Sequence, residues 1–279
     1  MNKGKIRVRF KATPEKKTHL RDNLWLKRDG QTFDIPWQNA KKLFRDYPDN
    51  FEKISLSLKE LGPPVHEPLK LSQITVLTIH YWPSGVLKRN LLSYLPEEVE
   101  FIKLDNEDNK NWTSIAKALN YGIKKAKNDI VICAHEDMVF GKGWFEDFIK
   151  QECRLKDWGA LGIVGMGLNR GMHWGWDCCG PYKATTLDEC CIIINRKNGI
   201  WFDDKLFRDW HCYGVDFCLQ AQHKGLSVYI VSGPATHGKR GSMDGHSREW
   251  RSQVRPNQRL LKEKWGKIFP AIITTTGIY

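Results

Sequence analysis

The chain has 279 residues and is strongly basic, with 44 Lys and Arg against 32 Asp and Glu and a formal net charge of +12 at pH 7. Its hydrophobic content of 41% is enough for a buried core, and no window approaches the roughly 18 uninterrupted apolar residues of a membrane span. The sequence therefore predicts no membrane partner, whereas its charge favours an anionic one, such as nucleic acid, nucleotide or acidic polymer.

The amino terminus and the cysteines bear on the compartment. The first ten residues, MNKGKIRVRF, contain no apolar signal core, and none of the eight Cys forms a CxxC pair. We therefore expect a cytoplasmic protein of a bacterial or phage-infected cell, with free thiols.

The first 66 residues are predicted to form a small basic α+β module. It is expected to contain a strand, a hairpin turning at Asp29-Gly30 and a helix, over residues 6–10, 24–35 and 37–47 respectively. A Pro-rich linker over residues 62–68 follows. We therefore divide the chain into a β-hairpin/helix module, residues 1–66, and a larger domain, residues 67–279.

From residue 67 onward, strands and helices alternate. Strands are predicted over residues 74–81, 99–104, 130–134, 160–165, 190–194 and 228–231. Helices are predicted over residues 85–95, 114–126, 144–155, 214–223 and 257–265. This order predicts an α/β, Rossmann-like fold with a mixed, mostly parallel sheet and helices on both faces.

Several common site motifs are absent from the sequence. It contains neither GxGxxG nor GxxxxGK[ST], which counts against a dinucleotide dehydrogenase and a P-loop NTPase. It also lacks GxSxG and HExxH, which lowers the odds for hydrolases and zinc proteases.

Three polar residues follow the apolar strand at 130–134, namely His135, Glu136 and Asp137. In open α/β sheets, ligands bind outside the carboxyl ends of the strands. Carboxylate oxygens suit Mg²⁺ or Mn²⁺, and Mn²⁺ also accepts imidazole. The pattern favours a metal site that holds a diphosphate; the alternative is a set of solvated polar residues at a strand end.

A series of motifs extends this pattern along the chain. It comprises Asp105 after the second strand of the larger domain, ALNYGI at 118–123, NDIVICAHEDM at 128–138, LDEC at 187–190, WFDDKLF at 201–207, DWHCYGVDFCL at 209–219 and ATH at 235–237. Together they resemble family 2-like glycosyltransferases of the GT-A fold, most closely the branch named for a streptomycin-biosynthesis protein domain. The resemblance covers about residues 72 to 250 and leaves out the amino-terminal module.

The resemblance implies a nucleotide-diphosphate sugar donor, such as a UDP-sugar, and a divalent metal. Asp137 stands in the family's metal-binding slot, with His135 and the later His237 as further ligands, a set that suits Mn²⁺ better than Mg²⁺. Three other residues are expected to contact the donor, namely Asp105, Asn120 and Glu136. Simpler readings are a turn residue for Asp105, a helix-packing residue for Asn120 and a surface loop histidine for His237.

The resemblance also implies an acid that acts as the base in an inverting reaction. Asp216 matches this position, although Val215 stands where Glu often precedes it, and His211 could support or replace Asp216. The alternative for Asp216 is a structural acid at a helix start. The loop over residues 171–176 is interpreted as the acceptor site, with His173, Trp174 and Trp176 as acceptor contacts or, equally, as packing anchors.

These features predict a metal-dependent hexosyl- or pentosyltransferase that acts on a hydroxyl acceptor. The charge favours DNA as the partner, with a hydroxymethyl-pyrimidine as the acceptor, as in phage DNA modification. Two alternatives stay open. One is a transferase for a glycan or small natural product, and the other is a non-catalytic nucleic-acid-binding protein with a degenerate transferase fold.

Overall fold

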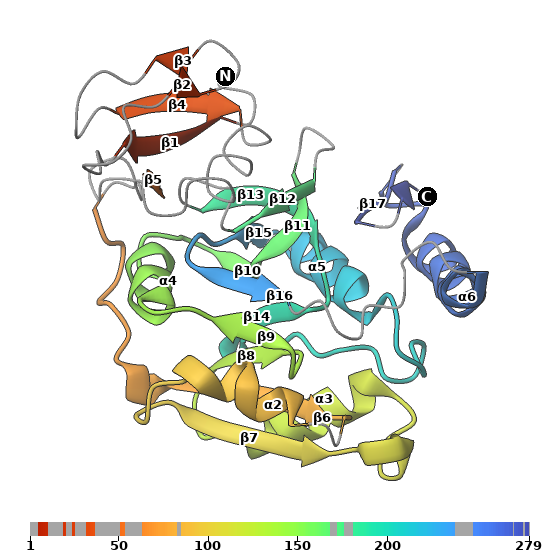
Figure 1. The fold of residues 1–279 in the computed structure, drawn as a ribbon. Coiled ribbons are helices and arrows are strands. Elements are labelled where there is room, and N and C mark those ends of the chain that lie inside the picture. Colours follow the sequence, from red (N-terminus) through yellow and green to blue (C-terminus); the bar gives the residue numbers. More distant parts are fainter. Residues whose placement is uncertain are drawn as a thin grey trace.

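The computed structural model describes residues 63–82, 85–167, 172–175, 181–237, 248–269, 271–275 and 277–278, together with five strands in the first 62 residues. Figure 1 shows the strands of the larger domain between helices. Among the described helices, none combines the length and the apolarity that crossing a membrane requires.

The largest sheet in the described part of the chain has nine strands in the order β12-β11-β13-β15-β10-β14-β8-β6-β7. Their bounds are Ile74–His80 for β6, Glu100–Asp105 for β7, Ile130–Ala134 for β8, Trp158–Gly162 for β10, Val164–Gly167 for β11, Met172–Trp174 for β12, Tyr182–Leu187 for β13, Cys191–Asn195 for β14 and Ser227–Ile230 for β15. Strands β7, β6, β8, β10, β15 and β11 run in one direction, and β14, β13 and β12 run in the other. The predicted mixed, mostly parallel sheet is confirmed.

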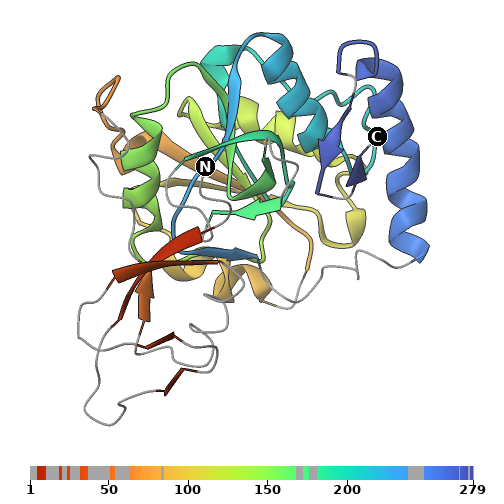
Figure 2. The same ribbon diagram turned by 90° about the horizontal axis from the view of Figure 1, so that it is seen from above.

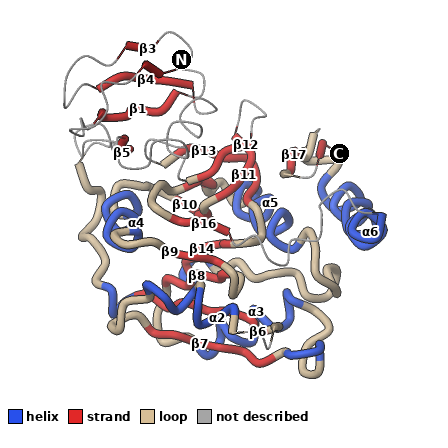
Figure 3. The backbone as a smooth tube through the Cα atoms, in the orientation of Figure 1, coloured by secondary structure: helices blue, strands red, loops and turns tan. Residues whose placement is uncertain are grey.

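Helices cover both faces of this sheet. One face carries α3 (Ile115–Lys125) and α5 (Tyr213–His223), against which α6 (Arg248–Trp265) packs. The other face carries α2 (Val86–Arg89), the 3₁₀ turn η2 (Leu91–Tyr94) and α4 (Trp144–Glu152). Figure 2 shows α4 separated from α5 and α6 by the strands, and Figure 3 shows the helices in blue around the red strands.

Strand β8 illustrates why both faces are covered. Its residues alternate, so that Val131 and Cys133 join the core on the α3 and α5 face, while Ile130 and Ile132 join the core on the α4 face. A strand buried on both sides reads as a continuous apolar run, as this one does in the sequence.

Helix α3 begins and ends where its sequence predicts. The Ser114 hydroxyl accepts a hydrogen bond of 3.3 Å from the backbone N–H of Lys117 and caps the helix. Gly122 allows α3 to lie close to β6, because a Cβ at this position would stand 2.4 Å from a methyl carbon of Leu77.

Some predicted elements differ from those observed. The helix expected over residues 85–95 breaks at Asn90, whose φ of −109° and ψ of −87° separate α2 from η2. The strand expected over residues 160–165 divides into β10 and β11. The sequence also did not predict β12 and β13 of the large sheet. Further elements that it did not predict are η1 (Leu71–Gln73), η3 (Glu107–Asn109), β9 (Met138–Phe140), η4 (Arg196–Asn198), β16 (Ala235–His237), β17 (Ile273–Thr274) and β18 (Gly277–Ile278).

The first 62 residues contain five described strands. Strands β1 (Lys5–Phe10), β4 (Thr32–Pro36) and β5 (Phe51–Lys53) form a sheet in the order β4-β1-β5, and β2 (His19–Leu20) pairs with β3 (Leu24–Trp25). Among the described strands, β3 pairs with β2 and β4 pairs with β1, while the turn expected at Asp29-Gly30 lies outside the described residues. The helix expected over residues 37–47 lies outside the described residues.

Candidate metal centre and active site

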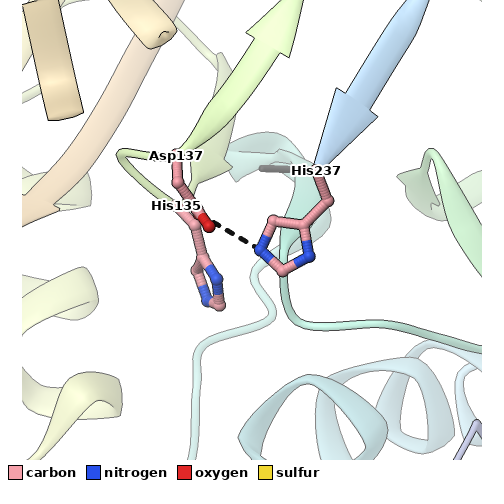
Figure 4. Close-up of side chains that lie close together, drawn as sticks. All are labelled: His135, Asp137 and His237. Carbon is pink, nitrogen blue, oxygen red and sulfur yellow. Dashed lines mark ion pairs between the residues drawn. The ribbon is translucent and has the colours of Figure 1, made fainter. Parts of the chain in front are cut away.

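Three potential metal ligands meet beyond the carboxyl end of β8. His135 and Asp137 directly follow this strand, and β9 begins with the next residue, Met138. Strand β9 pairs antiparallel with β16, and this pairing places His237, the last residue of β16, opposite Met138. One ligand atom from each of His135, Asp137 and His237 lies within 4.8 Å of the others, and Figure 4 shows the three side chains gathered in one place. The structure thus brings together the three residues that the sequence nominates for a metal.

The Asp137 carboxylate is suited to a cation. Its side chain is only 3% exposed, and Nε2 of His237 lies 3.1 Å from Oδ1, close enough for an ion pair. Among the described residues, however, this buried oxygen accepts no hydrogen bond of good geometry. A buried carboxylate oxygen without a proper donor is the environment that a bound metal ion would complete.

The two imidazoles have opposite pKa shifts. Burial, together with the neighbouring His237, lowers the pKa of His135 to about 4, so His135 is neutral at pH 7 and has a free lone pair. Burial would also lower the pKa of His237, but the adjoining Asp137 carboxylate outweighs burial and raises it. One carboxylate and two imidazoles form a donor set that fits Mn²⁺ better than Mg²⁺.

Glu136, between His135 and Asp137 in the sequence, holds the backbone of a neighbouring segment. Its side chain is buried, and its carboxylate accepts hydrogen bonds from the backbone N–H groups of Tyr81 and Trp82, at 2.9 and 2.8 Å. The other oxygen lies 2.6 Å from Nδ1 of His80. These bonds fix the segment that follows β6, and the predicted contact of Glu136 with the donor stays a prediction.

A cavity of about 550 Å³ lies beside the metal cluster, and His135 and Glu136 form part of its wall. Its floor is apolar, with Ile79, Leu119 and Ile192. Such a mixture of apolar walls and a few polar groups is typical of small-molecule sites.

Three aromatic residues give this cavity its character. Tyr81 contacts both Trp82 and Trp210 edge to face, with ring centroids 5.9 Å apart in each pair, and all three line the cavity. Tyr81 and Trp82 are not among the site residues that the sequence motifs predict. They directly follow β6, so the argument about strand ends applied to residues 135–137 would also have identified them.

Glu189 also lines the cavity and was not predicted as a site residue. It precedes β14, whose first residue, Cys191, pairs with Ala134 at the end of β8, so Glu189 lies at the same edge of the sheet. Its carboxylate accepts a hydrogen bond of 3.1 Å from the backbone N–H of Gly214 in the first turn of α5. The signal for Glu189 in the sequence was its place in the LDEC motif, but only the pairing of β14 with β8 shows that it lies at this edge of the sheet.

The electrostatics of Glu189 set it apart from the other acids. Burial raises the pKa of Glu189 to about 8, although the backbone N–H groups of Gly214 and Cys212 act in the opposite direction. His211 lines the same cavity and is half-buried. A carboxyl group with a pKa near neutrality in a cavity is suited to accept a proton.

Asp216, the predicted catalytic base, faces another helix and not the cavity. Asp216 is fully buried and does not line the cavity. Oδ1 accepts hydrogen bonds from Nε1 of Trp265 at 2.7 Å and from Nζ of Lys264 at 2.8 Å, and Oδ2 accepts one from Gln220 at 2.8 Å. The side chain points from α5 toward α6, so this acid joins two helices.

Asn120 and Asp105 do not line the cavity either. Asn120 is buried and exchanges hydrogen bonds with the backbone of Phe202, at 2.8 Å as donor and 3.1 Å as acceptor. These bonds attach the segment after β14 to α3, and the predicted contact of Asn120 with the nucleotide stays a prediction. Asp105 is exposed at the end of β7 and forms an ion pair of 2.6 Å with Lys103.

Two of the three residues expected to bind the acceptor belong to β12, an edge strand of the sheet. His173 and Trp174 belong to β12, in which His173 pairs with Gly165 of β11. Their side chains, and Trp176 as a whole, lie outside the described part of the chain.

Comparison with known proteins gives two kinds of finding. No family model matches the chain. One curated protein, ATP synthase subunits region ORF 6 from Fuscovulum blasticum, is 23% identical over 200 residues, which span 64% of this chain and 76% of that protein.

Solved structures resemble the chain in fold. GalNAc-T7, solved with UDP, GalNAc and Mn²⁺, matches 70% of this chain at 11% identity with a TM-score of 0.50, and the match spans about half, 51%, of its own length. Mannosyltransferase PcManGT from Pyrobaculum calidifontis, in complex with GDP-Man and Mn²⁺, matches 83% of this chain and 70% of its own at 12% identity, with a TM-score of 0.49. At such identities a likeness concerns the fold alone, and the chain has the mixed α/β fold of the GT-A glycosyltransferases.

Proposed function

We propose that the protein is a metal-dependent glycosyltransferase that moves a sugar from a nucleotide-diphosphate donor to a hydroxyl acceptor. The observation that carries this proposal is the position of the cluster of His135, Asp137 and His237 directly beside a 550 Å³ cavity. The fold is similar to that of GalNAc-T7, which was solved with UDP and Mn²⁺.

The metal would be held by Asp137, His237 and His135, with Mn²⁺ as the favoured ion. When bound, it would supply positive charge against the donor diphosphate. The neutral state of His135 keeps its lone pair available for that ion.

The cavity is proposed to hold the donor. Tyr81, Trp82 and Trp210 provide aromatic surface for a flat ring such as uracil, and the apolar floor excludes water. Glu136 positions this wall through the backbone of Tyr81 and Trp82. Asp105, at the end of the neighbouring strand, is kept as the proposed contact with the nucleoside.

Glu189 is proposed to act as the base. Its carboxylate takes the proton of the acceptor hydroxyl, while the hydroxyl oxygen forms a bond to the anomeric carbon and the bond from that carbon to the diphosphate oxygen breaks. A single displacement of this kind inverts the configuration of the sugar. His211, in the same wall, is the proposed supporting group.

For the acceptor, we propose a hydroxymethyl-pyrimidine in DNA, because the net charge of +12 favours a polyanion. His173, Trp174 and Trp176 are the proposed contacts with the extruded base. The alternative acceptor is a glycan or a small natural product, and the donor screen described next compares these acceptors with DNA.

The test is a donor screen with the purified full-length protein. UDP-sugars and GDP-sugars are incubated with Mn²⁺ or with EDTA, and the released nucleotide is measured with and without hydroxymethylated duplex DNA or glycan acceptors. We expect release that requires Mn²⁺ and increases with one acceptor class. Absence of release with every donor and acceptor would favour a non-catalytic binding protein.

A further inference from the structure

Helix α6 has two chemically distinct faces. Val254, Asn257, Leu261 and Trp265 are buried toward the domain. Arg255, Arg259 and Lys262 are exposed and follow each other at spacings of four and three residues, which places them on one face. We call these three residues the α6 basic row. In the sequence, the same spacing continues backward to Arg251 and Arg248.

The α6 basic row is not balanced by acids. In the part of the chain that the structure describes, none of the three residues forms an ion pair. Helix α6 contains six basic residues and two acidic ones. Like charges one helical turn apart repel each other, so the row destabilises the free helix, and an anionic partner would remove that cost.

The position of α6 relates the row to the cavity. Nδ2 of Asn257 donates a hydrogen bond of 2.8 Å to Oδ1 of Asp209, the residue that precedes Trp210 and His211 in the cavity wall. About two helical turns further on, Nζ of Lys264 lies 2.8 Å from Oδ2 of Asp203. Helix α6 therefore lies along the segment that leads into the cavity wall, and Figures 1 and 2 both place it at the outer edge of the molecule.

We propose that the α6 basic row binds the phosphate backbone of double-stranded DNA and so holds an acceptor nucleotide near the cavity. This rests on the proposed function for its biological meaning. Seven residues of helix rise by about 10 Å, and a DNA strand carries one phosphate per roughly 3.4 Å of axis, so the row spans more than one phosphate. The guanidinium groups of Arg255 and Arg259 match phosphate oxygens in pairs.

Contacts of this kind do not read sequence. They set affinity and orientation through charge, and their signature is a steep loss of affinity with salt. The identity of the modified base would then be read in the cavity and not by α6.

The experiment compares two variants of equal charge. The first is Arg255→Gln, Arg259→Gln and Lys262→Gln; the control is Lys117→Gln, Lys124→Gln and Lys125→Gln, which removes three exposed cations from α3. Binding of a labelled duplex is measured by fluorescence anisotropy between 50 and 200 mM salt. For the α6 variant we expect affinity to fall about tenfold or more and the salt slope to decrease by roughly 0.9 for each phosphate that the row no longer neutralises. The control should lose less than about threefold on the same scale.

Two outcomes would overturn the proposal. If both variants lose affinity equally, or if neither does, the row has no specific role beyond net charge. A selective loss of heparin binding, with DNA binding unchanged, would assign the row to an acidic glycan. Thermal melting verifies folding, and a variant that melts early is replaced by Arg259→Gln alone, for which a smaller slope change of the same sign is expected.

Donor hydrolysis by the wild-type protein without DNA is measured separately. If hydrolysis is absent while DNA binding depends on α6, the proposed function fails and the docking surface stands. If hydrolysis is present while DNA binding is independent of α6, the docking surface fails alone.

Discussion

The carboxylate of Glu189 and the backbone of Gly214 fit together without space for a side chain between them. A Cβ on Gly214 would stand 2.8 Å from Cγ of Glu189 and 2.4 Å from Cδ1 of Ile192, and the Gly214 N–H donates to Oε1 of Glu189. A glycine in the first turn of α5 therefore gives the acid access to the positive end of a helix. This holds the carboxylate in the cavity wall at a fixed position.

Replacing Glu189 by Gln should separate catalysis from binding. The amide keeps the shape but cannot accept the proton, so we expect kcat to fall by about 10² to 10⁴, with the donor affinity changed little. Steady-state kinetics and donor titration by calorimetry provide the two readings. A variant with unchanged kcat and weaker donor binding would make Glu189 a binding residue.

The pH dependence of the wild-type enzyme follows from the raised pKa of Glu189. The base acts only when deprotonated, and with a pKa of about 8 most of it is protonated at pH 6. We expect kcat/KM to rise about tenfold per pH unit below pH 8 and to level off above it. A profile flat from pH 6 to 9 would remove Glu189 from the rate-determining proton transfer.

The raised pKa of Glu189 also makes the stability of the protein depend on pH, and stability changes with pH in the opposite direction to kcat/KM. Because the folded-state pKa lies above the ordinary value of Glu, burial favours the protonated form, and stability decreases as the pH rises from about 4.5 toward 8. Glu189→Gln should therefore lose less stability than the wild type over this interval. Urea denaturation at pH 5 and pH 8.5 compares the two proteins.

Asp137→Ala should abolish Mn²⁺-dependent donor turnover in a folded protein. The carboxylate is a proposed ligand whose Oδ1 has no well-formed hydrogen bond in the described structure, so its loss should lower the melting temperature of the metal-free protein by no more than the loss of its ion pair with His237. Glu98→Ala, which removes an exposed carboxylate, is the matched control. Full Mn²⁺-dependent turnover in Asp137→Ala would contradict the metal assignment.

Asp216→Ala should affect folding more than chemistry. The change leaves Lys264 and Trp265 without their shared acceptor between α5 and α6, and the loss of one partner from a buried pair costs about 3 kcal/mol. We expect a lower urea midpoint, with kcat at saturating donor within about threefold of the wild type, far from the 10²-fold scale of a lost base. A large loss of kcat without a loss of stability would restore Asp216 as the base.

The sequence predicts the framework of the fold because its strands and helices carry local signals. The continuous apolar run of residues 130–134 and the helical pattern of residues 114–126 both depend on neighbours in sequence, and a strand and a helix occur there as expected. The end of the strand at 130–134 likewise pointed to His135 and Asp137, whereas His237 was nominated only through the family resemblance.

The contacts of other residues could not be predicted from the sequence, because their partners lie far along the chain. Asp216 faces Trp265, 49 residues later, and Asn120 meets Phe202, 82 residues later. An acid or amide in a motif has the same letter whether it faces a cavity or another helix. Glu189 was missed for the same reason, because the antiparallel pairing of β14 with β8 is not encoded locally.

The pairing of β9 with β16 links metal affinity to the folding equilibrium. Asp137 and His237 are 100 residues apart in the chain and adjoin only when these two strands pair. An unfolded chain has no such site, so an ion that binds there selects the native state and raises the free energy of unfolding by RT ln(1 + [M]/Kd), about 2.7 kcal/mol at a hundredfold excess over Kd. The melting temperature should thus depend on the logarithm of the free Mn²⁺ concentration, in the absence of any sugar donor.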